Sequence, residues 1–343
     1  KDNFIRLKKL PLITIAITCF NAEKTIERAI LSALNQNWPN FEVIIVDDGS
    51  KDSSKEIIKK YESKTKNLHF YNQKINNGCA KSRNILISKA KGEFIAFFDD
   101  DDFSRSDRLS LQFDHLINYE KNVSTKLIAC FASGERIYPN GYKKNLSAVG
   151  AYGIPPIGLQ MANYLLFNER IHKIDYGAGA PTCSLLARTS LFRNLKGFDS
   201  KIRRQEDVDF AIKLAMRGGH FIGIKTPVIE QYVSFSNDKN VFIEYKSSLC
   251  ILNKYCDYLK SKGVYKYMQL WMLLKFFHLS NNDYKALSVF IRIFLLYPCR
   301  TIRHFTSSAL KRLLHEQLIN SSPKRIMIKK NCIKFLNPII NIF

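Results

Sequence analysis

The chain lacks close cysteine pairs and long uninterrupted apolar runs. Its eight cysteines form no C-x-x-C pair, which disfavours a zinc site or a disulfide framework and favours a reducing compartment. Its two strongest apolar stretches, 271–277 and 289–297, are interrupted by charges before the roughly 18 apolar residues that a membrane-spanning helix needs. Residues 1–9 are polar and basic with no long apolar run after them, so we expect no signal peptide.

The two common glycine-rich phosphate loops are also absent. Residues 18–23, which follow the first expected strand, contain no glycine, so the dinucleotide fingerprint G-x-G-x-x-G cannot lie there. No G-x-x-x-x-G-K-[ST] motif occurs in the sequence, which excludes a P-loop. If the protein binds nucleotide phosphates, a metal ion must neutralise them instead.

Acidic residues are scarce in the last third of the chain. Residues 231–343 contain five Asp or Glu against 18 Lys or Arg, and the whole chain carries a formal net charge of +23. Such a surplus attracts nucleic acid, anionic lipid or a phosphorylated substrate without choosing among them. We expect 236–343 to form a basic, amphipathic helical region. It either lies on an anionic membrane surface or packs on the rest of the chain with its basic face in water.

The sequence does contain a run of four carboxylates directly after an apolar segment. Residues 94–98 are typical of a fully buried strand, and Asp99, Asp100, Asp101 and Asp102 follow it without a turn residue. Four adjacent like charges repel one another, and a divalent cation on oxygen ligands would stabilise them. We therefore predict a metal site at the tip of this strand, with a solvated acidic turn as the alternative.

Short apolar segments and helical patterns alternate over the first 120 residues. This order predicts an α/β fold with a mostly parallel sheet, right-handed crossovers and helices on both faces. The expected strands are 13–17, 41–46, 68–71 and 94–98, and the expected helices are 23–34, 53–61, 81–90 and 106–119. Ligands bind beyond the carboxyl ends of such strands, so Asp47, Asp48 and the acidic run should share one edge with the end of the first strand.

The pattern is less regular after residue 127. The expected strands there are 127–132, 136–138, 182–187, 220–225 and 228–233, and the expected helices are 159–167 and 208–216. We therefore divide the chain into a domain of residues 1–235 and the helical region 236–343.

Several short motifs stand in a fixed order on these expected strand ends. They are 18–21 with Glu23, 46–50, 77–78 with 82–84, 99–102, 197–199 and 206–207. Together they resemble family 2 glycosyltransferases with the GT-A fold, a Rossmann-like sheet, over about residues 11–235. The resemblance implies a nucleotide-sugar donor, commonly a UDP-sugar, and inverting transfer of the sugar to a hydroxyl.

The resemblance assigns the nucleoside of the donor to the first two motifs. It implies that Asp48 accepts a hydrogen bond from the uracil N–H and that Thr18, Phe20, Asn21 and Glu23 complete the pocket. The alternative for Asp48 is to cap the turn that follows it, a role that the preceding aspartate fits equally.

The resemblance also implies Mg²⁺ or Mn²⁺ on the acidic run, where it would offset the charge of the leaving diphosphate. The D-x-D motif of the family aligns with Asp99 and Asp101. We expect Asp101 to coordinate the metal directly and Asp99 and Asp100 to contact the donor, although the fourfold run leaves the register ambiguous by one residue. Arg83 would reach the donor from the third expected helix; its alternative is a surface helix arginine.

Asp207 matches the general base of the family, which takes the proton from the acceptor hydroxyl. It lies at the start of an expected helix, next to Glu206. For both carboxylates the alternative is a simple interaction with the positive end of the helix dipole.

We therefore predict an inverting glycosyltransferase that extends a lipid-linked glycan in surface polysaccharide biosynthesis, such as O-antigen, capsule or lipooligosaccharide. By analogy with such enzymes we expect a peripheral protein at the cytoplasmic face of a bacterial plasma membrane. Two alternatives stay open: a nucleotidyltransferase would attack phosphorus with the same metal and sheet, and a polyanion-binding module would use the basic surface. No nucleic-acid motif is recognisable, so nucleic acid is not an expected partner.

Overall fold

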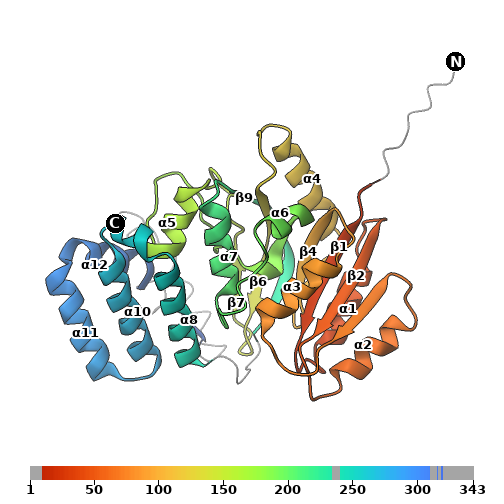
Figure 1. The fold of residues 1–343 in the computed structure, drawn as a ribbon, viewed down its shortest axis with the longest axis horizontal. Helices are drawn as coiled ribbons and strands as arrows, with labels where there is room; N and C mark the ends of the chain where they lie inside the picture. The colour runs from red at the N-terminus through yellow and green to blue at the C-terminus, as the bar shows by residue number, and fades with distance from the viewer. Residues whose placement is uncertain (1–9, 234–239, 310–314, 316–317, 320–343) are drawn as a thin grey trace.

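The computed structural model describes residues 10–233, 240–309, 315, 318 and 319. They form a central sheet flanked by helices, with a group of carboxy-terminal helices on one side (Figure 1). The basic residues 1–9, the expected boundary at 235/236 and the end of the helical region after residue 319 lie outside the described residues. Among the helices described, none is both long and apolar enough to cross a membrane.

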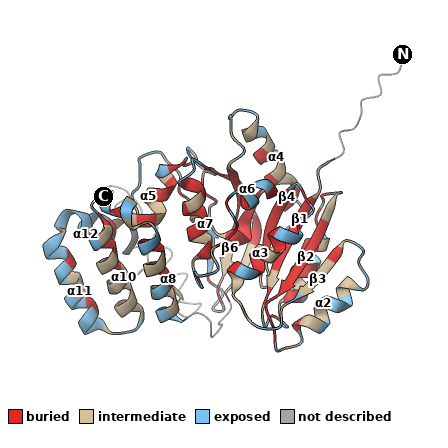
Figure 2. Ribbon diagram, viewed as in Figure 1, coloured by how far each residue is buried: buried red, intermediate tan, exposed pale blue. Residues whose placement is uncertain are grey.

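The first half of the sheet is parallel, as predicted. Its strands, in the spatial order β3-β2-β1-β4, are β1 (Ile13–Cys19), β2 (Phe41–Asp47), β3 (Leu68–Asn72) and β4 (Phe94–Asp99). Parallel neighbours need crossover connections, and these are α1 (Ile26–Leu34), α2 (Ser54–Glu62) and α3 (Cys79–Lys89). Strands β1, β2 and β4 are apolar and almost wholly buried (Figure 2), because helices cover both faces of the sheet.

The second half of the sheet is mixed. Strand β8 (Leu185–Arg188) inserts antiparallel between β4 and β6 (Ile128–Ile137), and β9 (His220–Tyr232) pairs parallel with β6. Two short strands that the sequence pattern does not predict, β5 (Phe103–Ser104) and β7 (Lys143–Leu146), pair antiparallel with β9 and β6. The expectation of a mostly parallel sheet therefore holds for the first half only. The antiparallel direction of β8 depends on its pairing with β4 and β6, which are distant in the sequence, and the local sequence pattern does not reveal it.

Strands β6 and β9 are each continuous where two shorter strands were predicted. Their pairing shifts register on both sides of Ser133, which marks a β-bulge that bends the strand and increases its twist. At the neighbouring Gly134, a Cβ atom would lie 2.2 Å from the carbonyl oxygen of Ile229. A glycine is therefore needed at this position for the close approach of the two strands.

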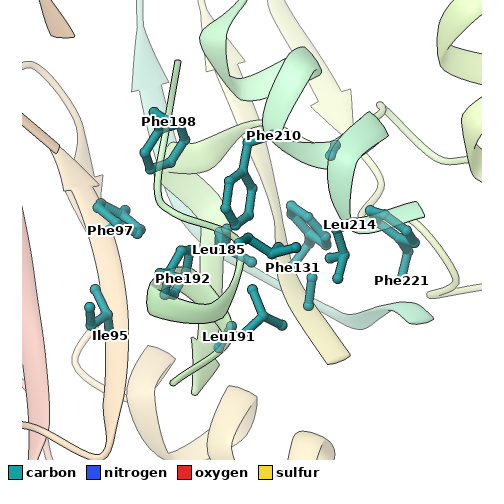
Figure 3. Packing of buried hydrophobic residues seen from close by; sticks show 14 of the residues in the cluster. Ile95, Phe97, Phe131, Leu185, Leu191, Phe192, Phe198, Phe210, Leu214 and Phe221 are labelled. Atoms are coloured by element: carbon teal, nitrogen blue, oxygen red, sulfur yellow. The ribbon is translucent and has the colours of Figure 1, made fainter. Parts of the chain in front are cut away.

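Two apolar cores lie on opposite faces of the sheet. The covering helices are α1, α2 and α4 (Arg108–Glu120) on one face, and α3, α5 (Leu159–Phe167), α6 (Thr189–Asn194) and α7 (Glu206–Ala215) on the other. On the second face Phe97 of β4 lies edge-on to Phe192 and Phe198, and Phe210 of α7 stacks on these two rings (Figure 3). This aromatic cluster fixes the start of α7 relative to the carboxyl end of β4.

The carboxy-terminal helices pack against α5 and α7. They are α8 (Val241–Lys254), α9 (Cys256–Ser261), α10 (Tyr265–Leu279), α11 (Asp283–Leu296) and α12 (Pro298–His304), followed by a short π-helix at Phe305–Ala309. A third apolar cluster joins Leu166 and Ile212 to residues of α8 and α10 such as Ile251 and Trp271. The Lys254 ammonium also contacts the fully buried carboxylate of Asp209 at 2.9 Å.

Candidate active site

The ends of β1, β2 and β4 meet at one edge of the sheet, which we call the rim. Thr18 of β1 lies opposite Asp99 of β4 in the strand register. The backbone N–H of Phe20, just after β1, donates to a carboxylate oxygen of Asp100 at 3.0 Å. The structure thus brings the first motif and the acidic run into direct contact.

Hydrogen bonds also tie the loop after β1 to the loop after β2. The Asn21 N–H donates to Ser50 Oγ at 2.8 Å, and the Asn21 side-chain oxygen accepts from the Lys51 N–H at 2.9 Å. Glu23 accepts from the Ser53 N–H at 3.1 Å. Asn21 and Glu23, which were predicted to bind the nucleotide-sugar donor, therefore also hold the two rim loops together.

Asp47 and Asp48 have different structural roles. Asp47 accepts from the N–H groups of the two residues after Asp48, so the turn cap belongs to Asp47. Asp48, which is buried, accepts from Gln73 Nε2 and from the N–H groups of Asn77 and Gly78, at 2.8–2.9 Å. Asp48 therefore fixes the loop before α3. A carboxylate has about four acceptor positions, so one remains for a ligand.

Two residues that the sequence analysis did not identify form hydrogen bonds with the acidic run. Arg28 of α1 donates to the main-chain oxygen of Asp101 and lies over the ring of Tyr232, 4.0 Å from its centroid. The Tyr232 N–H donates to Asp102 at 3.3 Å. Neither Arg28 nor Tyr232 belongs to a recognisable motif, and the end of β9 reaches the rim only through the non-local topology of the sheet.

The carboxylates of the run fit a hard divalent cation. Ligand atoms of Asp99, Asp102 and Cys183 lie within 4.8 Å of one another. Burial is the largest cause that raises the pKa of Asp99, Asp100 and Asp102, and the charges of neighbouring aspartates raise it further. Burial also raises the pKa of the Cys183 thiol, and Mg²⁺ or Mn²⁺ prefers carboxylate to sulfur. Asp101, the predicted ligand, is not a member of this group.

A fully buried arginine lies beneath the run. Arg108 donates to Ser104 Oγ at 2.9 Å and to the main-chain oxygen of Phe97 at 2.8 Å, and its guanidinium faces the ring of Phe98. Burial lowers its pKa to about 10. Its hydrogen bonds join the end of β4 to the segment that follows the acidic run. The sequence carries no signal for this role, since the residue reads as an ordinary helix arginine.

Arg83 connects the acidic run to α7. One guanidinium nitrogen lies 2.5 Å from a carboxylate oxygen of Glu206, and another lies 3.7 Å from Asp99. The residue is only 6% exposed, so the alternative of a surface helix arginine is wrong. Glu206 is also buried. Its ion pair with Arg83 is a specific contact that an interaction with the helix dipole alone does not explain.

Asp207 lies at the start of α7, next to that ion pair. Its Oδ1 accepts from the Val208 N–H at 2.8 Å, an arrangement that also suits a residue interacting with the helix terminus. Burial, followed by the negative charge of Glu206, raises the pKa of Asp207 to about 6. A carboxylate with such a pKa is largely ionised at neutral pH and is a stronger base than an ordinary aspartate.

The parallel half-sheet, the acidic rim and the helix that carries Asp207 have the arrangement that the resemblance to GT-A glycosyltransferases predicts. Residues 14–180 match glycosyl transferase family 2, and the chain therefore carries a glycosyltransferase domain of that family. The resemblance drawn from the motifs is confirmed.

Comparisons with individual proteins agree with this assignment. An uncharacterized glycosyltransferase of Haemophilus influenzae is 42% identical over 108 residues, which are 32% of this chain and 43% of that protein. Chondroitin synthase of Escherichia coli is 33% identical over 143 residues, 40% of this chain and 20% of that enzyme. The chain thus spans less than half the length of these relatives. A crystal structure of S. aureus TarS 1-349 in complex with UDP-GlcNAc has a TM-score of 0.58 at 16% identity, covering 95% of this chain and 91% of that TarS fragment; it shows the fold alone.

Proposed function

We propose that the protein transfers a sugar from a UDP-sugar to a hydroxyl of a glycan acceptor, with inversion at the anomeric carbon. The observation that carries this proposal is Arg83, which contacts Asp99 of the acidic run and Glu206 beside Asp207. In this proposal the donor site and the general base therefore lie at the same rim. The family 2 domain and the UDP-GlcNAc complex of TarS support a nucleotide-sugar donor.

In this proposal the nucleoside lies against the ends of β1 and β2. Asp48 accepts the uracil N–H with its remaining acceptor position, and Thr18, Phe20, Asn21 and Glu23 line the pocket. The hydrogen bonds that hold these loops together supply a pre-formed site, which reduces the ordering cost of binding.

In this proposal Asp101, together with Asp99 and Asp102, would hold Mg²⁺ or Mn²⁺, and Asp100 and Arg83 would contact the donor. When bound, the metal stabilises the negative charge that develops on the leaving diphosphate. The positive charge of Arg83 lowers the pKa of Asp99 against the effect of burial, which favours the ionised form that a cation requires.

Asp207 is the general base. The proton of the acceptor hydroxyl passes to its carboxylate while the hydroxyl oxygen attacks the anomeric carbon on the face opposite the diphosphate. The hydrogen bond from the Val208 N–H orients the carboxylate. The raised pKa of Asp207 supports this role, because a base must bind the proton appreciably in the transition state.

We further propose a lipid-linked acceptor in surface polysaccharide biosynthesis, with the protein peripheral at the cytoplasmic face of a bacterial plasma membrane. The name of the Escherichia coli relative, chondroitin synthase, supports a polysaccharide product. The outer face of α11 supports the membrane. It exposes large apolar side chains at helical spacing: Tyr284 (85%), Leu287 (59%), Ile291 (50%) and Leu295 (75%). In this proposal residues 1–235 catalyse the transfer, and residues 236–343 provide the surface that contacts the membrane.

The test is a panel of nucleotide sugars incubated with the full chain and Mg²⁺, Mn²⁺ or EDTA. We expect metal-dependent release of UDP from one donor. Asn variants of Asp99, Asp101 and Asp102 should each weaken metal-dependent UDP binding, and the order of their effects identifies the direct ligands. Release of sugar 1-phosphate instead of UDP would mean attack on phosphorus, as in nucleotidyl transfer, and no turnover of any donor would remove the enzymatic proposal.

A further inference from the structure

A cavity is lined by residues at the end of α5 and in the carboxy-terminal helices. These helices lie away from the rim (Figure 1). The volume of the cavity is about 170 Å³. This is room for several water molecules but less than the roughly 300–1,000 Å³ of pockets that enclose drug-sized ligands. The cavity therefore suits a small group and not a whole nucleotide sugar.

The lining of this cavity is strongly basic. Lys262, Arg300 and Arg303 contribute three cations, and Glu169 contributes the one carboxylate among the lining residues. Lys262 and Arg303 are exposed, so their charges lie at the mouth of the cavity without a desolvation cost. A positively charged concave surface concentrates anions, and arginine matches the geometry of phosphate oxygens.

The inner wall is aromatic and held in place. The His304 ring stacks on Trp271 with centroids 3.8 Å apart, and its Nδ1 lies 3.1 Å from the hydroxyl of Tyr267. Burial lowers the pKa of His304 to about 4, so the imidazole is neutral at physiological pH. Arg300 is fixed by donating to the main-chain oxygen of Gly263 at 2.8 Å. The cavity thus has a rigid wall with cationic side chains around it.

We propose that this cavity binds a phosphate group. Two sources offer the same chemistry: the headgroup of an anionic lipid, or a phosphate or pyrophosphate in solution. The position favours the lipid, since α12 carries both Arg303 and the apolar side chain of Ile302, which is 53% exposed. The site is independent of the rim, and its occupation requires no sugar transfer.

The experiment compares two double variants of the full chain that remove the same charge. Lys262→Ala/Arg303→Ala changes the cavity, and Lys246→Ala/Lys266→Ala removes two exposed lysines of the same region that do not line it. Arg300 and His304 are left intact because they hold the wall. Melting temperatures of both variants check that the fold survives.

Binding of inorganic pyrophosphate is measured by calorimetry in EDTA, so that metal at the rim does not contribute. We expect the cavity variant to bind about tenfold more weakly, or worse, and the control to match the unmodified chain. Equal affinities for all three proteins would overturn the proposal, because the cavity charges would then not contribute to binding. Equal losses in both variants would also overturn it, because the charges would then act without a defined site.

Flotation with phosphatidylglycerol vesicles then identifies the source. If the phosphate belongs to a lipid, the cavity variant should lose more vesicle binding than the control. If both variants lose vesicle binding equally while only the cavity variant loses pyrophosphate, the ligand is a soluble phosphate.

Discussion

The rim and the carboxy-terminal helices hold their charges in opposite ways. At the rim, Asp48, Arg83 and Glu206 are 4%, 6% and 9% exposed, and each has named partners. On the helices, Lys285 and Arg292 are exposed. Buried charges are costly unless paired, whereas exposed charges act through a screened field. Single substitutions should therefore have large, specific effects at the rim and small, additive effects on the helices.

The largest effect is expected for Asp207→Asn. Without a base the transfer rate should fall by about 10²–10⁴-fold, while UDP binding is retained because the acidic run is unchanged. The matched control is Asp257→Asn, which neutralises an almost fully exposed carboxylate on α9. Transfer assays and calorimetry with UDP measure the two properties. Full activity in the Asp207 variant would remove its role as base.

The next effect concerns the free energy of unfolding. Arg83→Met leaves the buried carboxylate of Glu206 without its partner, so we expect a loss of about 3–5 kcal/mol in urea unfolding. Lys81→Met, an exposed lysine of the same helix, should change stability by less than about 0.5 kcal/mol. Replacing both members of the pair, Arg83→Met with Glu206→Met, should restore part of the loss. Similar values for Arg83→Met and Lys81→Met would contradict the contrast between rim and surface.

A smaller effect is expected in the pH dependence of transfer. If Asp207 is the base, kcat/KM should fall as the pH drops through about 6, because the carboxylate becomes protonated. Glu206 raises this pKa by its negative charge. Glu206→Gln should therefore move the acid limb to lower pH, toward the ordinary aspartate value of about 3.9. A limb that stays in place or moves upward would show that another group controls it.

The smallest effect is expected on α11. Lys285→Ser and Arg292→Ser should each change unfolding by less than about 0.5 kcal/mol. Each should weaken binding to anionic vesicles by about 1 kcal/mol, and the two losses should add. Vesicle binding that is unchanged in the double variant would exclude α11 from the membrane surface.

The sequence predicted the parts of this molecule that depend on local order. The alternation of strands and helices up to β4, and the meeting of their carboxyl ends, follow from apolar periodicity and the rules for parallel sheets. The ordered set of motifs, which includes those around Asp48 and Asp99, carried the family resemblance. These features need no knowledge of which distant segments pair.

The rest depends on contacts between distant segments. The antiparallel insertion of β8 and the approach of Tyr232 to Asp102 arise from pairings over more than 80 residues. The pairing of Arg83 with Glu206 spans 123 positions, so the sequence pattern left a surface arginine as an equal alternative. The close approach of Ile229 to Gly134, which β6 and β9 need in order to pair, cannot be recognised in the sequence.

Helix α7 contributes to two apolar cores at once. Phe210 and Leu214 belong to the core on the sheet, and Ile212 belongs to the cluster shared with α8 and α10. Removing the last hundred residues would uncover Ile212, Leu166 and Ile202. The burial of each of these side chains contributes about 1.5–3 kcal/mol to the stability of the fold, so the helix that carries Asp207 would be less firmly held. A shortened protein should therefore lose the proposed transfer activity together with these helices, and surface substitutions are the sound way to separate the proposed membrane attachment from the proposed sugar transfer.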